Sequence, residues 1–207
     1  MKSRFLSFIT LCMMAGAINT TPAAEPPKPS GPLNAPVDSL VVLEKAVARD
    51  SSQFDKLVAL GVLYLDRDRP EEAVRVLARA NKVRPKQVKV LVNLGAALDA
   101  SREADQAQVR YREALEIAPR DSLAACRLAS SLYSQGKHQE SVDLLRDTIH
   151  DQPRSYCAYF TLGVAFADAG IYRDAIRMWR KVIEVAPTSP EAASARESIE
   201  VLEKFVQ

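Results

Sequence analysis

The stretch that decides the fold is FDKLVALGVLYLDRDRPEEAVRVLARANKVRPKQ, residues 54–87. Apolar residues recur three and four positions apart from Leu57 to Tyr64 and again from Ala73 to Ala80, which predicts two amphipathic helices. A polar run that ends at Pro70 separates them. Pro85 closes the second helix, because the residue before a proline is pushed out of the α region. We therefore expect a helical hairpin over this stretch.

The same pattern returns every 34 residues, which is the signature of a repeat architecture. Four hairpins are predicted, over residues 54–87, 88–121, 122–155 and 156–189. A glycine or alanine recurs in the first helix of each hairpin, and we expect the two helices to approach most closely there. Five sets of positions carry the period: Leu60, Leu94, Leu128 and Leu162; Gly61, Gly95, Ala129 and Gly163; Ala73, Ala107, Ser141 and Ala175; Leu77, Tyr111, Leu145 and Trp179; and Pro85, Pro119, Pro153 and Pro187.

The flanks extend the pattern by half a unit on each side. Residues 37–51 match the second helix of a repeat whose first helix is missing, because Leu43 and Ala46 keep the 34-residue spacing. Residues 190–207 match a first helix without its partner, with Ser189 placed to cap its start. The outer face of this last helix is charged, as a terminal cap requires for solubility.

The period and the order of residue types resemble the tetratricopeptide repeat family over residues 54–189. This resemblance implies an all-α fold, a right-handed α-solenoid of four helical hairpins with a half repeat at each end. It also implies that the first helices line a concave groove in which a protein or peptide partner binds.

The N-terminus predicts export. Lys2 and Arg4 precede an apolar stretch over residues 5–18 and then small residues, so residues 1–24 are expected to be a secretory signal peptide. The alternative is a retained N-terminal helix, but the apolar stretch is short for a membrane span. Residues 25–36 are a proline-rich linker, which we expect to be extended. The protein is then periplasmic or extracellular, and it meets a membrane only through the cleaved signal.

Composition and motifs argue against several functions. Without the signal peptide the chain has 26 basic and 26 acidic residues, which does not favour nucleic-acid binding. No nucleotide-binding, hydrolase or metalloprotease motif occurs, and His138 and His150 are 12 positions apart, which is not a metal-ligand spacing. We expect no enzyme activity, cofactor, metal or small-molecule substrate.

The candidate binding residues follow from the resemblance, which places ligand contacts on the outward side of the first helices. An apolar lining there favours a binding face, although the proline-rich segment or a second copy of the chain are alternative covers for it. In the family's clamp for a peptide carboxylate, only two of five positions match here, at Asn93 and Arg127; they either anchor one carboxylate or are a lone pair of surface residues. The predicted groove residues are Val58, Val62, Leu65, Val92, Asn93, Leu123, Arg127, Tyr133, Phe160 and Val164.

These observations predict an exported, non-catalytic scaffold or adaptor that holds an extended peptide or an amphipathic helix in its groove. Two alternatives stay open. One is a structural homo-oligomer of the cell envelope, and the other is an accessory subunit that recruits substrates to an envelope enzyme complex.

Two cysteines remain after the signal peptide. Cys126 and Cys157 are 31 residues apart on adjacent first helices, so we expect their side chains to face each other. A disulfide requires Cα atoms within about 7 Å, which is tight for helices that pack about 8–10 Å apart. A disulfide and a pair of packed thiols therefore both remain open, and two thiols without further ligands do not favour a metal.

Overall fold

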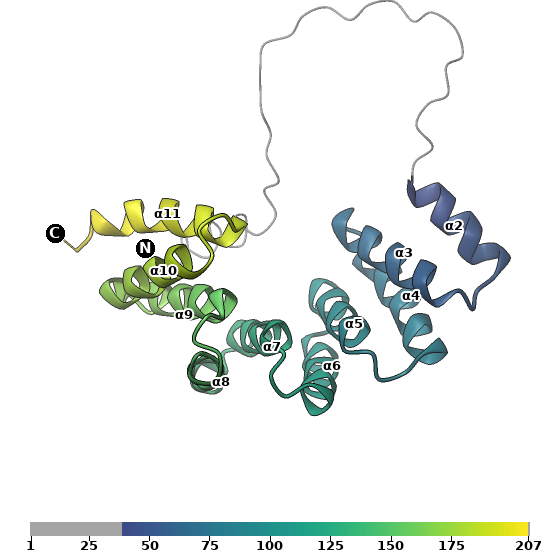
Figure 1. The fold of residues 1–207 in the computed structure, drawn as a ribbon, viewed down its shortest axis with the longest axis horizontal. Helices are drawn as coiled ribbons and strands as arrows, with labels where there is room; N and C mark the ends of the chain where they lie inside the picture. Colours follow the sequence, from purple (N-terminus) through teal and green to yellow (C-terminus); the bar gives the residue numbers. More distant parts are fainter. Residues whose placement is uncertain (1–38, 207) are drawn as a thin grey trace, which may run out of the picture. The chain divides into compact units, whose positions relative to one another are not determined.

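The structure, a computed structural model, describes residues 39–206; the predicted signal peptide and linker lie outside them. Within the described residues all regular structure is helical, which confirms the all-α expectation. The helices, labelled as in Figure 1, are α2 Ser39–Arg49, α3 Phe54–Asp66, α4 Pro70–Val83, α5 Val88–Ala100, α6 Ala104–Ile117, α7 Ser122–Ser134, α8 His138–Asp151, α9 Tyr156–Asp168, α10 Tyr172–Val185 and α11 Pro190–Glu203.

The helices form a solenoid in which each one packs against the next, from α2 to α11 (Figure 1). The pairs α3 with α4, α5 with α6, α7 with α8 and α9 with α10 are the four hairpins predicted from the sequence. The first helices α3, α5, α7, α9 and α11 also contact one another in order. Each first helix therefore has a second helix on one side and other first helices along its flanks.

The turns inside the four hairpins share one geometry. Asp68, Arg102, Gly136 and Gly170 lie 34 residues apart and all have positive φ, from 54° to 78°. In each turn, the N–H of the next residue donates to a carbonyl five positions earlier, as from Arg69 to Tyr64 at 2.9 Å. This is the Schellman end of a helix, which needs one residue in the left-handed region. The 34-residue period therefore extends to the backbone of the turns.

The two helices of a hairpin approach each other more closely at Gly61 and Gly163 than the sequence predicted. A Cβ at Gly61 would lie 2.5 Å from Cγ of Leu77, and a Cβ at Gly163 would lie 2.5 Å from Nε1 of Trp179. Even a methyl group does not fit at these positions unless the large residue of the second helix moves. The third hairpin instead has Ala129, which is fully buried.

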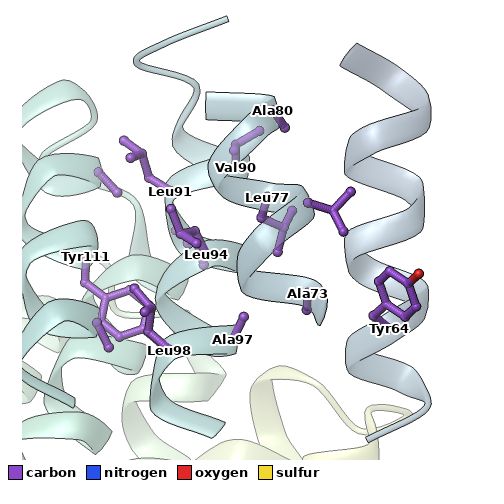
Figure 2. Close-up of a cluster of buried hydrophobic side chains, with 14 of the residues drawn as sticks. Tyr64, Ala73, Leu77, Ala80, Val90, Leu91, Leu94, Ala97, Leu98 and Tyr111 are labelled. Carbon is purple, nitrogen blue, oxygen red and sulfur yellow. The ribbon is translucent and has the colours of Figure 1, made fainter. Parts of the chain in front are cut away.

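The core runs along the seam between first and second helices. Figure 2 shows part of it, where Leu77, Leu94 and Tyr111 extend from the three successive helices α4, α5 and α6. The last helix is capped as expected: the Ser189 hydroxyl accepts from the N–H of Ala192 at 3.1 Å, and Pro190 occupies the first turn. None of the helices in residues 39–206 is long and apolar enough to cross a membrane.

Candidate binding groove

One hollow of the described region lies at its N-terminal end and has a volume of about 640 Å³. Most of its wall comes from α3, with contributions from α2 and from the start of α5. Two of the predicted groove residues, Val58 and Val62, are part of this wall. The lining residues are Leu43, Phe54, Asp55, Val58, Ala59, Val62, Leu63, Asp66, Gln87, Lys89 and Val90.

Apolar and charged groups are separated within the hollow. Val58 and Val62 are half-buried, so each presents part of an apolar side chain. Asp55, Asp66 and Lys89 are exposed in the same wall and make no ion pair with any described residue. An apolar surface bordered by available charges of both signs can bury the side chains of a ligand and bond its polar groups.

Val92 was predicted to line the groove, and this is wrong. Its side chain is only 4% exposed and belongs to the core that also contains Leu91 and Leu94. The reason is that α5 lies between α3 and α7 and contacts both, so three sides of this helix are covered. Leu65 is half-buried and packs against the same core, which leaves it little free surface.

The predicted residues of the last two hairpins do not join the hollow. Phe160 and Val164 are half-buried and pack against the core around Trp179. Leu123 is 52% exposed and lines a separate hollow of about 360 Å³, together with Tyr156 and neighbouring residues. The predicted groove residues therefore do not line one continuous groove: Val58 and Val62 line one hollow, and Leu123 lines another.

Tyr133 is already engaged within the fold. Its hydroxyl donates to Asp168 at 2.8 Å, and its ring lies 4.4 Å from that of His138. Burial, followed by the hydrogen bond to this carboxylate, raises the pKa of Tyr133. The side chain thus joins two adjacent hairpins, and it stays neutral at physiological pH.

Arg127 lies near a feature that the sequence did not reveal, whereas Asn93 is half-buried on α5. Arg127 is exposed, and its charge lowers the pKa of the Asp99 carboxyl. Burial acts more strongly in the opposite direction, so the pKa of Asp99 is raised overall. Asp99 accepts hydrogen bonds from Tyr111 at 2.9 Å and from Ser131 at 2.8 Å. The carboxylate that interacts electrostatically with Arg127 therefore belongs to the protein itself.

This network was missed because its members occupy apolar positions of the repeat. Tyr111 stands where the other hairpins have Leu77, Leu145 or Trp179, and its ring is fully buried. A buried hydroxyl needs a partner, so a tyrosine in this set was the available signal for a nearby acceptor.

The two cysteines are joined in the structure. A disulfide connects Cys126 on α7 to Cys157 on α9, and the two Cα atoms are 6.2 Å apart. This separation is within the range that a disulfide allows. The bond ties the third hairpin to the fourth. Among the described residues, no group of three or more His, Cys, Asp or Glu is placed to hold a metal ion.

Comparison with known proteins identifies the fold. A crystal structure of MamA matches with a TM-score of 0.60 and 22% identity, covering 76% of this chain and 89% of that one. YrrB, described as a TPR protein with an unusual peptide-binding site, matches with a TM-score of 0.56 and 22% identity over 76% of this chain and 81% of that one. A thermophilic TPR protein of Thermus thermophilus matches with a TM-score of 0.66 and 15% identity over 77% and 88% of the two chains.

No curated protein matches the sequence. The family model described as Tetratrico peptide repeat matches residues 88–192, which is half of the chain. Together with the 34-residue period and the four hairpins, this match shows that the chain belongs to the tetratricopeptide repeat family, whose members are in general non-catalytic scaffolds for protein interactions.

Proposed function

We propose that this protein is an exported scaffold that binds an extended peptide or an amphipathic helix of a partner protein in the hollow of α3 and α5. The observation that carries the proposal is the combination of half-buried Val58 and Val62 with the exposed charges of Asp55, Asp66 and Lys89 in one wall. Apolar side chains of a ligand fill such a hollow, and the charges bond its backbone or side-chain polar groups.

Export is supported by the sequence of the N-terminus. Lys2 and Arg4 followed by the apolar residues 5–18 match a secretory signal. The disulfide between Cys126 and Cys157 is compatible with this location, because disulfides persist in oxidising compartments such as the periplasm.

The experiment is a binding assay with a single substitution in the hollow. Wild-type protein is used to capture partners from an envelope fraction, and the affinity of the captured partner is then measured with purified components. Val62→Asp places a charge in the apolar part of the wall, and Val62 is outside the core clusters, so the fold is retained. We expect this variant to weaken binding at least about tenfold.

Two controls separate binding from folding. Val109→Asp changes a side chain that is 45% exposed on α6, away from the hollow, and should bind the partner like the wild type. Leu94→Ala removes a buried core side chain and should cost about 2–5 kcal/mol of stability. Phe160→Ala is less informative, because Phe160 packs against the core. Equal binding by Val62→Asp and Val109→Asp would contradict the proposed site.

The homo-oligomer is tested with the same proteins. Light scattering after size-exclusion chromatography gives the mass of the wild type and of Val62→Asp. A stable oligomer that only Val62→Asp dissociates would mean that a second copy, and not a partner peptide, fills the hollow.

A further inference from the structure

The described solenoid starts with a second helix, and the face that a first helix would cover is open. In α4, which packs against both α3 and α5, Val76 is 6% exposed and Ala80 is fully buried. The equivalent residues of α2, 34 positions earlier, are Val42 and Ala46. Val42 is 49% exposed and Ala46 is half-buried. The sequence of α2 is thus that of a covered helix, but no described helix covers this face.

The flank of α3 is open on the same side. Ala97, Ser131 and Ala165 occupy equivalent positions in α5, α7 and α9, and each is at most 5% exposed. They are buried against the preceding first helix, as shown by the bond from Ser131 to Asp99. The equivalent residue of α3 is Leu63, which is larger and half-buried. An apolar side chain therefore stands where a preceding first helix would pack.

The open flank of α3 has a positively charged residue, Lys56, where the later first helices have small or apolar residues. Val90, Ala124 and Ala158 are equivalent residues of the later first helices, and they are at most 2% exposed. In α3 the position holds Lys56, which is exposed. Asp50, which accepts hydrogen bonds from Ser52 and Gln53, is near enough for its charge to interact with that of Lys56. An acidic residue on a helix docked on this flank would add a second negative charge facing the ammonium group of Lys56, which docking partly removes from water.

The charge has a defined place on such a helix. Equivalent residues of all hairpins are numbered here as in the first hairpin, so Asp99 is at position 65 and Ser131 at position 63. Because Ser131 donates a hydrogen bond to Asp99 of the preceding first helix, position 65 of one first helix contacts position 63 of the next. Two turns earlier, position 58 then meets position 56. The acidic residue of the docked helix is expected at position 58, facing Lys56.

The proline-rich sequence before α2 does not favour such a helix. The sequence before α2 has six prolines between residues 22 and 36, and proline disrupts helices. At the other end, α11 has Arg196, Glu197 and Glu200 at the positions of Leu162, Gly163 and Phe166 in α9, and all three are exposed. These charges cannot be buried against α2 at low cost, so α11 of a second copy does not fit the open face.

We propose that the open face of α2 and α3 binds an amphipathic helix of another protein and thereby completes the N-terminal half repeat in trans. The helix has about 13 residues, like α3, α5, α7 and α9. It has glycine or alanine where it meets Leu43, the equivalent of Leu77, and an acidic residue where it meets Lys56. Leu43 and Leu63 also line the hollow, so this inference rests on the proposed function and deepens it: it names a helical ligand that takes the place of a missing element at the end of the solenoid.

The probe is a fluorescein-labelled peptide with the sequence of Phe54–Asp66, the first helix of the first hairpin. A lactam bridge between Asp55 and a lysine introduced by Ala59→Lys holds it helical, because a free peptide of this length is only marginally so. Val58→Glu supplies the acidic residue. Binding to the mature protein is measured by fluorescence anisotropy.

Substitutions in the protein test the face and the charge separately. Val42→Glu should weaken binding at least about tenfold, whereas Val201→Glu, at a residue of α11 that is 45% exposed, should leave it unchanged. Lys56→Glu should weaken binding of the acidic peptide and restore binding of a peptide with Val58→Lys. A peptide with Gly61→Leu should bind at least about tenfold more weakly, because the close approach is blocked.

Several outcomes would overturn the inference. They are no binding to the wild type, equal effects of Val42→Glu and Val201→Glu, or no preference for charge at position 58. If the wild type is a dimer that Val42→Glu dissociates, the face belongs to a second copy and the proposed partner is wrong. The proposed function is tested by binding of the captured partner to Val62→Asp, and the further inference by binding of the labelled peptide to Val42→Glu. A negative result in one assay therefore does not decide the other.

Discussion

Gly95 lies where the first helix of the second hairpin approaches Tyr111 most closely. A Cβ built at Gly95 would lie 2.8 Å from both Cδ1 and Cζ of the Tyr111 ring. Carbon atoms in contact are normally about 3.5–4.0 Å apart, so the ring has to move by about 1 Å. The ring is fully buried, and its hydroxyl is held by Asp99 at 2.9 Å. We therefore predict that Gly95→Ala destabilises the protein.

The magnitude follows from three opposing effects. Alanine is more favourable than glycine inside a helix by about 1 kcal/mol. Overpacking a buried site costs about 1–3 kcal/mol, and loss of a hydrogen bond to a charged group costs about 1.5–3 kcal/mol. The expected loss for Gly95→Ala is about 2–4 kcal/mol, and the corresponding decrease in Tm is about 5–15 °C.

The assay is urea unfolding followed by circular dichroism at the helical bands. The double variant Gly95→Ala, Tyr111→Leu recreates the pair that the third hairpin has at Ala129 and Leu145. A double-mutant cycle should therefore show a favourable coupling energy of about 1–3 kcal/mol between the two substitutions. If Gly95→Ala is as stable as the wild type, or if the coupling is absent, the close approach does not determine the packing of this hairpin.

Three further predictions address export, the disulfide and the buried carboxylate. N-terminal sequencing of protein from the exported fraction should find a start between residues 18 and 25, and an intact first methionine there would contradict cleavage. Thiol counting on denatured, unreduced mature protein should find no free thiol, since Cys126 is bonded to Cys157 and Cys12 leaves with the signal; two thiols per chain would contradict the bond in the exported protein. Because burial raises the pKa of Asp99, the folded state holds this proton more tightly than the unfolded state, so the carboxyl's contribution to stability is present below about pH 4 and is lost as the pH rises through its folded-state pKa. Urea midpoints between pH 3 and 7 should therefore fall less in Asp99→Asn than in the wild type, and parallel curves would show that this carboxyl does not contribute.

The sequence alone determined the helices and their pairing. Hydrophobic periodicity reports which face of a helix is apolar, and the 34-residue period reports which helices are equivalent. Gly61 and its equivalents located the close approach, and the spacing of Leu43 and Ala46 identified α2 as a second helix. These are local properties, so one sequence is enough to read them.

The tertiary structure decided what each apolar face meets. Val92 and Val62 look alike in the sequence, but α3 and α7 flank α5 and bury Val92, while Val62 faces the hollow. The bond between Cys126 and Cys157 depends on a Cα separation of 6.2 Å, which periodicity cannot supply. The open face at Val42 exists because no described helix precedes α2. Burial is a property of neighbouring helices and their stagger, and a period along one chain contains neither.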